Sequence, residues 1–286
     1  MRNESPTWLP KTGDNMSTIA LFVDHDRDRA RAVGERVAEA FRTHGCDVFF
    51  LPREPRSADL IVTVGGDGTL LHAARFAVEC DAPLIGINTG RLGFLTEFDD
   101  GDPRIEQLPD LFERGLVIEE RLALQAIFAG KSHFALNDVI VRKGGVPRIV
   151  PFTLRLNDEA AAQVPADGVC IATPTGSTAY FLSAGGSIIS PNVDAFGIVP
   201  LLPHTLFSRP IVVPAGSRIE VGCDVEPAHA QLECDGNVVA EIEPGASVVV
   251  HRHPKPVRFA RTEPLRFFER LGEKLQWGVS IKERLR

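Results

Sequence analysis

The strongest chemical signal in the sequence is a glycine-rich turn that carries one carboxylate, residues 65–69 (GGDGT). An apolar run ends immediately before the turn, and a helical pattern begins immediately after it. Glycines let a ligand approach the backbone closely, and the N–H groups of a strand-to-helix turn bind anions such as phosphates. The residues that we expect to bind phosphate are Gly65, Gly66, Gly68 and Thr69.

Asp67 within this turn needs a partner other than phosphate. Two like charges 4 Å apart repel by roughly 4 kcal/mol at an effective dielectric constant of 20. The partner is either Mg²⁺ shared with nucleotide phosphates, or a hydroxyl whose proton the carboxylate accepts. A purely structural alternative is that the Asp67 side chain caps the following helix. The turn is not a P-loop, because the lysine of GxxxxGK[ST] is absent.

A second group of polar residues occupies 173–180 (TPTGSTAY), directly after the apolar run 169–172. Its Ser and Thr hydroxyls can donate hydrogen bonds to phosphate, ribose or base edges. Tyr180 is the only tyrosine, and a ring beside such a turn can stack on a base, worth roughly 1–3 kcal/mol. The alternative is a hydroxyl-rich helix cap with Tyr180 half-buried. Further polar turns lie at Asn137-Asp138, Asp167-Gly168 and Asp235-Gly236-Asn237. Residue pairs of these types most often have only a structural role, as turn formers.

The elements that must position these residues alternate in the first part of the chain. Apolar, strand-like runs at 19–23, 48–51, 59–64 and 83–87 enclose helical patterns at 24–42 and 70–79. This order predicts an α/β domain with a Rossmann-like parallel sheet over residues 16–117, with ligands near the carboxyl ends of its strands.

The pattern changes near residue 118, where short strand-like runs separated by Gly, Pro, Asn and Asp begin. We expect a β-rich C-terminal domain over residues 118–263, with one helical interruption near 178–188. Residues 264–286 return to helical spacing, with Leu265, Phe268, Leu271 and Leu275 on one face, and we expect this segment to pack back on the first domain. Residues 1–15 are polar, and we expect a disordered extension there.

Charge and cysteine content exclude several classes of protein. Lys and Arg total 31 and Asp and Glu total 38, so the formal charge is −7, which argues against general nucleic-acid or anionic-membrane binding. No stretch approaches the roughly 20 apolar residues of a membrane span. Five scattered cysteines without metal-type spacing are typical of buried thiols, and with no signal-peptide pattern we expect a cytoplasmic protein.

Taken in order along the chain, these motifs resemble the NAD kinase family. The GGDGT turn is shared with diacylglycerol kinases and 6-phosphofructokinases, whereas TPTGSTAY followed by LSAGG is much more specific. Further family-like stretches are 88–94 (NTGRLGF), 203–204, 208–210 and 273–278 (EKLQWG). The resemblance covers nearly everything from Met16 to Trp277.

The resemblance implies direct transfer of the γ-phosphate of ATP to the 2′-hydroxyl of the adenosine ribose of NAD. It implies Mg²⁺ that is held by ATP rather than by a protein cluster, with Asp67 as the candidate protein ligand. It also implies an active site between two domains, in a homodimer or homotetramer. Asp67 would accept the proton. The residues it places at NAD are Asp67, Gly68, Phe94, Asn137, Asp138, Arg148, Asp167, Thr178, Ala179, Tyr180, Phe181, Leu182, Ser183 and Asn237.

Two positions depart from the family pattern. Pro165 stands where many members have Lys or Arg, and Asn237 stands where the family often has Gln. Within the kinases, the alternative is a lipid kinase with the same turn. From other classes, the alternatives are a dinucleotide-binding oxidoreductase and a non-catalytic NADP sensor. An oxidoreductase would carry GxGxxG after its first strand, yet residues 24–28 contain no glycine.

Overall fold

The computed structural model describes residues 7–8, 16–52, 57–90, 93–145, 149–206, 208–223 and 230–277. The chain forms two compact units: unit 1 is Met1–Glu120 with Val257–Arg286, and unit 2 is Arg121–Pro256. The chain therefore leaves unit 1 after Glu120 and returns to it at Val257, whereas the sequence pattern placed these changes at residues 118 and 264.

Unit 1 is built on an eight-stranded sheet in the order β1-β7-β20-β5-β4-β2-β3, with β6 paired to β5. The pairs that link β3, β2, β4, β5, β6 and β20 are parallel, and β1 pairs antiparallel with β7. The strands are β1 (Thr7–Trp8), β2 (Thr18–Val23), β3 (Asp47–Phe50), β4 (Leu60–Gly65), β5 (Leu84–Asn88), β6 (Phe98–Asp99), β7 (Leu116–Arg121) and β20 (Val257–Arg261).

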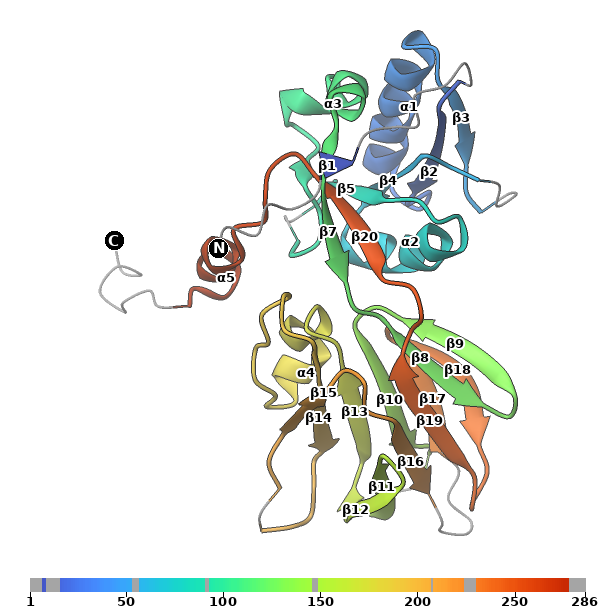
Figure 1. The fold of residues 1–286 in the computed structure, drawn as a ribbon, viewed down its shortest axis with the longest axis vertical. Helices are drawn as coiled ribbons and strands as arrows, with labels where there is room; N and C mark the ends of the chain where they lie inside the picture. The colour runs from blue at the N-terminus through green and yellow to red at the C-terminus, as the bar shows by residue number, and fades with distance from the viewer. Residues whose placement is uncertain are drawn as a thin grey trace. The chain divides into compact units, whose positions relative to one another are not determined.

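Helices cover both faces of this sheet (Figure 1). The helices of unit 1 are α1 (Asp28–Thr43), α2 (Asp67–Glu79), α3 (Leu108–Arg114) and α5 (Phe267–Leu275), with a 3₁₀ turn η1 (Pro103–Ile105); α1, α2 and α3 are the ones that cover the sheet. α1 and α3 share a core with the sheet that includes Val33, Phe41 and Phe112. Every residue of β4 and β5 is buried, as expected for central strands of a parallel sheet. The GGDGT turn begins at Gly65, the last residue of β4, so it lies at the carboxyl end of a central strand.

Three expectations for unit 1 need correction. Residues 257–261 belong to its sheet and not to the β-rich domain, because β20 pairs with β5 through Phe259 and Leu84. Thr7–Trp8, expected in a disordered extension, form β1 because β7 offers them a partner strand; the rest of 1–15 lies outside the described residues. In α5 only Leu271 is buried, and Phe268, expected on the same face, is 66% exposed.

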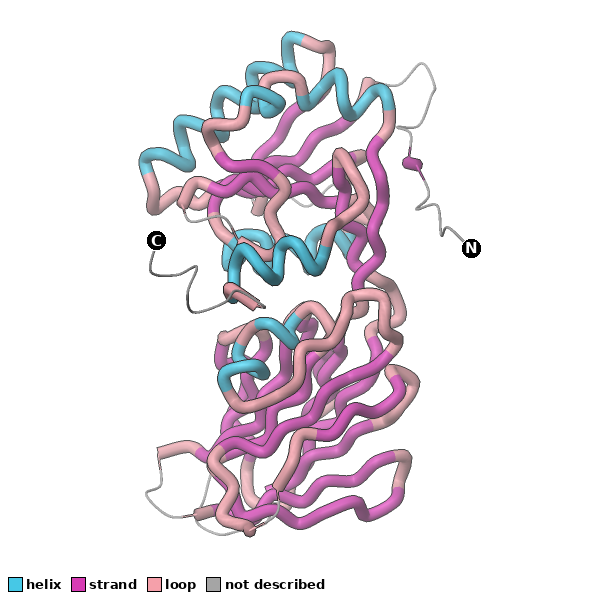
Figure 2. The backbone as a smooth tube through the Cα atoms, turned by 90° about the vertical axis from the view of Figure 1, so that its left-hand side faces the viewer, coloured by secondary structure: helices cyan, strands magenta, loops and turns pink. Residues whose placement is uncertain are grey.

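Unit 2 is a sandwich of two antiparallel six-stranded sheets, ordered β15-β14-β13-β10-β17-β18 and β12-β11-β16-β19-β8-β9 (Figure 2). Its strands are β8 (Leu124–Phe128), β9 (Lys131–Ala135), β10 (Asp138–Lys143), β11 (Val150–Leu156), β12 (Glu159–Ala166), β13 (Gly168–Ala172), β14 (Ala195–Leu201), β15 (Ile211–Pro214), β16 (Ile219–Cys223), β17 (Ala230–Cys234), β18 (Asn237–Ile242) and β19 (Ser247–Arg252). Buried side chains of both sheets, Val139, Phe152, Phe196 and Val250 among them, form one core.

The helical interruption of unit 2 is shorter than the sequence pattern indicated. It consists of η2 (Gly176–Thr178) and the single turn α4 (Tyr180–Ser183). Phe181 of α4 packs with Ile140, Cys170 and Val199 in a second, smaller core on the outer face of the first sheet. This packing fixes the TPTGSTAY segment on the sheet made by β10, β13 and β14.

Candidate active site

The GGDGT turn joins β4 directly to α2, and the helix begins at Asp67, three residues earlier than the sequence pattern indicated. Gly66 occupies the N-cap position, and its N–H donates to Thr69 Oγ1 at 3.3 Å. Gly68 is exposed at the start of the helix. The free N–H groups of the first helical turn therefore lie at the carboxyl end of β4, where an anion is stabilised.

The Asp67 carboxylate is fixed by backbone groups of a distant segment. Its Oδ2 accepts a hydrogen bond from the N–H of Phe94 at 2.7 Å, and its Oδ1 accepts one from the N–H of Leu95 at 3.1 Å. Gly93 makes room for this contact, since a Cβ there would lie 1.9 Å from Asp67 Oδ1. Asp67 does not cap α2, so the capping alternative is wrong.

Two arginines hold the segment that binds Asp67. Arg270 of α5 donates through one Nη1 to the carbonyl oxygens of Phe94 and Thr96, at 2.8 and 3.0 Å. Arg261, which is 1% exposed at the end of β20, donates to the carbonyl oxygen of Leu95 at 2.9 Å. The guanidinium of Arg261 also pairs with Glu97 and Glu119 at 3.2 and 3.3 Å, which offsets the cost of burying its charge.

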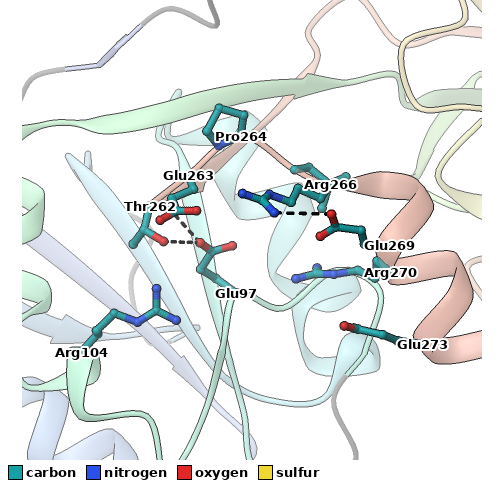
Figure 3. Close-up of a pocket in the computed structure, with 10 residues that line it drawn as sticks. Glu97, Arg104, Thr262, Glu263, Pro264, Arg266, Glu269, Arg270 and Glu273 are labelled. Atoms are coloured by element: carbon teal, nitrogen blue, oxygen red, sulfur yellow. Dashed lines mark hydrogen bonds and ion pairs between the residues drawn. The ribbon is translucent and has the colours of Figure 1, made fainter.

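A cavity of about 230 Å³ lies beside these arginines (Figure 3). Its lining is charged, and the cations on it are already engaged: Arg266 pairs with Glu269 at 3.4 Å, and Arg104 hydrogen-bonds Asp102 at 2.7 Å. We assign no ligand to this cavity, because the arginines on its lining already have partners within the protein.

Buried oxygens without hydrogen-bond partners lie at the strand next to the GGDGT turn. Asn88 Oδ1 and Thr89 Oγ1 are buried and unpaired among the described residues. Asn88 is opposite Gly65 in the β4–β5 register, and the N–H of Thr89 donates to the Gly65 carbonyl at 3.0 Å. Uncharged oxygens are among the ligands that hard cations such as Mg²⁺ accept, and these two lie on the strand next to the turn that carries Asp67.

In unit 2, Asn137 and Asp138 are positioned by a carboxylate from the DGN turn. Asp235 accepts hydrogen bonds from the N–H groups of Leu136, Asn137 and Asp138 at 2.7, 2.7 and 3.1 Å. Asp235 and Gly236 both have positive φ, 48° and 78°, which is the geometry of the two-residue turn between β17 and β18. Asp235 therefore both forms this turn and holds the backbone of Asn137 and Asp138, the two candidate NAD-binding residues.

Asp138 is an unusual carboxyl group, because it is 4% exposed and lies near two other acids. Burial, and then the charges of Asp235 and Glu233, raise the pKa of Asp138 to about 7. A carboxyl group in this state can be protonated near neutral pH and can donate a hydrogen bond to a ligand oxygen.

The hydroxyls of the TPTGSTAY segment mostly build the turn itself, which corrects the expectation that all four are available to a ligand. Thr173 Oγ1 donates to the Leu136 carbonyl at 2.6 Å, and Ser177 Oγ donates to that of Pro174 at 2.6 Å. Thr175 Oγ1 accepts from the buried Arg121 at 3.0 Å. Thr178 Oγ1 makes a longer bond of 3.3 Å to a carbonyl and is the least buried of the four.

Tyr180 lies at a cavity of about 380 Å³ within unit 2. The Tyr180 ring is 45% exposed, and Asp167 and Ser183 line the same cavity. Lys143 of β10 also lines it, and its Nζ lies 2.6 Å from Asp167 Oδ1. Lys143 thus brings a cation next to Asp167, although Pro165 lacks the positive side chain common there in the family.

The remaining candidate residues differ in accessibility. Phe181 is fully buried, with Gly186 and Gly197 packed against its ring, so its side chain packs in the core of unit 2. Phe94, Ala179 and Leu182 are partly exposed. Asn237 is exposed, and its amide donates to the Asp235 carbonyl at 3.2 Å. Arg148 lies outside the described residues.

Sequence reasoning missed Asp235, Lys143, Arg261 and Arg270 as parts of these sites. The Asp-Gly turn signal located Asp235 but did not reveal its three long-range hydrogen bonds. Lys143 could have been found from the register, because β10 and β13 are adjacent and its N–H donates to the Asp167 carbonyl at 2.9 Å. Neither Arg261 nor Arg270 has a local sequence signal.

The described residues hold neither a metal-binding cluster nor a membrane-spanning helix. No group of three or more His, Cys, Asp and Glu side chains is placed there to hold a metal ion. No helix in the same part of the chain is long and apolar enough to cross a membrane. All five cysteines are free thiols; Cys46 and Cys80 are only partly buried, which corrects the expectation that every thiol is buried.

Comparison with known proteins gives consistent matches. The family model described as ATP-NAD kinase N-terminal domain matches residues 19–116, and that described as ATP-NAD kinase C-terminal domain matches residues 136–262. The chain is 37% identical over 280 residues to an NAD kinase of Chromohalobacter salexigens, covering 96% of this chain and 95% of that protein. It is 40% identical over 226 residues to an NAD kinase of Gemmatimonas aurantiaca, covering 77% and 78% of the two chains.

Solved structures agree with these matches. The yeast NADH kinase complexed with NADH superposes with a TM-score of 0.82 at 22% identity, covering 94% of this chain and 89% of that one. An NAD kinase from Archaeoglobus fulgidus in complex with ATP gives a TM-score of 0.74 at 25% identity, covering 92% and 99%. The expected fold, an α/β domain followed by a β-rich domain, is confirmed, and the chain belongs to the NAD kinase family.

Proposed function

We propose that this NAD kinase transfers the γ-phosphate of ATP to the 2′-hydroxyl of the adenosine ribose of NAD, with Asp67 as the proton acceptor. The ribose oxygen forms a bond to the γ-phosphorus while the bond from that phosphorus to the β-γ bridging oxygen breaks, so that NADP and ADP are the products. The hydroxyl proton passes to the Asp67 carboxylate. The main observation is the fixed orientation of this carboxylate, held through both oxygens at the anion-binding end of β4 and α2.

Holding the carboxylate in one orientation favours the reaction, because phosphoryl transfer depends chiefly on positioning and on charge stabilisation. Each Asp67 oxygen accepts one backbone hydrogen bond and keeps lone-pair capacity for a hydroxyl proton. The residues of the turn, Gly65, Gly66, Gly68 and Thr69, would bind phosphate through N–H groups at the start of α2.

Unit 2 supplies the groups proposed to bind NAD. The cavity at Tyr180 is lined by an aromatic ring, a carboxylate and a hydroxyl, which suit adenine and ribose. Asn137 and Asp138, fixed by Asp235, would bind sugar or amide groups. The remaining residues that we propose to contact NAD are Gly68, Phe94, Arg148, Asp167, Thr178, Ala179, Leu182, Ser183 and Asn237, with Phe181 acting as support from the core.

A divalent cation, Mg²⁺ by preference, would accompany ATP and neutralise the negative charge that the transferred phosphate carries. It would be held mainly by the phosphates of ATP. Asp67, Asn88 Oδ1 and Thr89 Oγ1 are the protein oxygens at the turn that fit such a cation.

The sheet edge at β15 supports a homodimer or homotetramer as part of this proposal. β15 is the edge strand of its sheet, and Ile211 and Val212 on it are 40% and 54% exposed. An apolar, unpaired edge is a site at which a second copy can add. Sedimentation of wild type and Val212→Glu at micromolar concentration tests this, and a wild-type monomer would contradict it.

We also place the enzyme in the cytoplasm, because its five thiols are free and such thiols persist in a reducing compartment. Fractionation of cells that express the tagged chain tests this assignment, and recovery from a membrane or secreted fraction would contradict it.

Asp67→Asn tests the catalytic assignment in a coupled assay of NADP formation. We expect kcat to fall by about 10²- to 10⁴-fold, the usual contribution of a general base. Glu79→Gln, an exposed carboxylate at the other end of α2, is the matched control and should stay within about twofold of wild type. Near-normal kcat of the Asp67→Asn variant would contradict the assignment of Asp67 as the proton acceptor. Simultaneous measurement of ADP release separates a kinase from a protein that only binds NAD.

A further inference from the structure

We propose that Arg270 on α5 is a positioning residue for Asp67, acting through the peptide group between Phe94 and Leu95. The inference rests on the role proposed above for Asp67. The carbonyl of this peptide group accepts a hydrogen bond from Arg270 Nη1 at 2.8 Å, and its N–H donates to Asp67 Oδ1 at 3.1 Å. A single peptide group therefore connects a guanidinium cation to the candidate catalytic carboxylate.

The geometry of the peptide bond makes this connection direct. In a trans peptide the C=O and N–H point in opposite directions within one rigid plane. When Arg270 fixes the direction of the Phe94 carbonyl, it also fixes the direction in which the Leu95 N–H approaches Asp67. A cation at the carbonyl also polarises the peptide group, which strengthens the hydrogen bond that its N–H donates.

The segment 93–97 needs such support, because most of it lies outside regular secondary structure. Within it, Arg270 also binds the Thr96 carbonyl at 3.0 Å, so one guanidinium nitrogen spans two carbonyls of this segment. Arg261 binds the carbonyl between them, that of Leu95. Three successive carbonyls are thus held by two arginines, while two N–H groups hold Asp67.

The surroundings of Arg270 show that its charge lies close to these groups. Burial and the neighbouring Arg261 lower the pKa of Arg270, and the carboxylates of Glu97, Asp67 and Glu119 act in the opposite direction. Figure 3 shows the Arg270 side chain extending from α5 toward Glu97. Leu271 is the one buried apolar residue among those described in α5, so polar contacts of Arg270 as well as this apolar contact hold the helix within unit 1.

Arg270 is better suited to the test than Arg261. Arg261 is buried and pairs with two carboxylates, so its loss would disturb the charge balance of the fold as well as the segment that binds Asp67. The matched control is Arg266→Met at the N-cap of α5, four residues before Arg270, since the Arg266 side chain is 71% exposed and its ion pair among the described residues is with Glu269.

The experiment compares Arg270→Met, Arg270→Lys and Arg266→Met in steady-state assays of NADP formation. For Arg270→Met we expect kcat to fall by about tenfold or more while KM for NAD and for ATP stays within about threefold, since a positioning defect acts on the transition state. Arg270→Lys should give an intermediate kcat, because an ammonium keeps the charge but not the planar guanidinium. Arg266→Met should stay within about twofold of wild type.

A double-mutant cycle with Asp67→Asn identifies the route of the effect. If Arg270 acts through Asp67, Arg270→Met should change the residual kcat of Asp67→Asn by less than about twofold. Equal losses in both backgrounds would overturn the proposal, as would an unchanged kcat in Arg270→Met. A drop in melting temperature with raised KM values and an unchanged kcat would assign Arg270 to anchoring α5 alone, and would also overturn it.

The two proposals fail in distinguishable ways. Near-normal kcat in Asp67→Asn removes the catalytic role of Asp67, and this inference with it. An inactive Asp67→Asn beside a fully active Arg270→Met overturns only the inference about Arg270. If Arg270→Met does not fold, Arg270→Lys decides: a severalfold loss of kcat at unchanged KM supports the proposal, and wild-type kcat overturns it.

Discussion

The buried carboxyl group of Asp138 makes the free energy of unfolding of this protein depend on pH, and this dependence can be measured. Its pKa is raised from 3.8 to about 7, chiefly by burial. The native state therefore holds this proton more tightly than the unfolded chain, and the free energy of unfolding falls as pH rises from about 4 to about 7. With 1.36 kcal/mol for each pKa unit, the ionised carboxylate costs roughly 4 kcal/mol above that range.

Asp138→Asn removes this titration while keeping the shape of the side chain. The stability of the variant relative to wild type should therefore rise by roughly 4 kcal/mol between pH 4 and pH 8 and then level off. An amide in place of the carboxyl adds a constant offset, so the change with pH is the quantity that matters. The measurement is urea unfolding of both proteins, followed by the circular dichroism of the sheets, at a series of pH values.

The control for this experiment is Asp158→Asn, whose side chain is 79% exposed and pairs with Arg218. A surface pair of this kind contributes about 0–1 kcal/mol, so we expect a small difference from wild type throughout. A stability difference between wild type and Asp138→Asn that stays constant from pH 4 to pH 8 would refute the reasoning, because it would mean that burial does not penalise the charge at Asp138.

Three further predictions concern the described contacts. Gly93→Ala should reduce kcat at least as strongly as Asp67→Asn while the protein still folds, because its Cβ would fall 1.9 Å from the Asp67 carboxylate; NADP formation and a melting curve check this. Lys143→Met should raise KM for NAD severalfold with kcat nearly unchanged, because Asp167 loses its cation; a wild-type KM would count against a role for this ion pair at the NAD site. Phe181→Ala should lower the free energy of unfolding by about 3–5 kcal/mol, as expected for a fully buried aromatic side chain, and urea unfolding measures it.

The elements that could be predicted best from the sequence are the strands in which every residue is buried. The apolar runs at 59–64 and 83–87 agree within one residue with β4 and β5, because both faces of these strands are buried and every position must be apolar. The position of Asp67 just after β4, at the start of a helix, could be predicted for the same reason, since a glycine turn between a buried strand and a helix leaves few alternatives.

Contacts between distant residues could not be predicted in this way. Asp235 bonds N–H groups that are 97 to 99 positions away, and nothing in a local pattern encodes such a pairing. The run 257–261 resembles the strands before it, so its pattern could not show that β20 joins the other sheet. Phe181 follows a polar turn in a helix of one turn, too short for a periodicity to show which side is buried.

The order of the units along the chain has a consequence for synthesis on the ribosome. Unit 2 is one continuous stretch, Arg121–Pro256, and it interrupts unit 1, whose last strand β20 and helix α5 are made afterwards. A nascent chain can therefore complete unit 2 while unit 1 still lacks a strand of its sheet and both arginines that hold the Asp67 segment. The contacts that hold the Asp67 segment can therefore form only after β20 and α5 have been synthesised, when most of the polypeptide has left the ribosome.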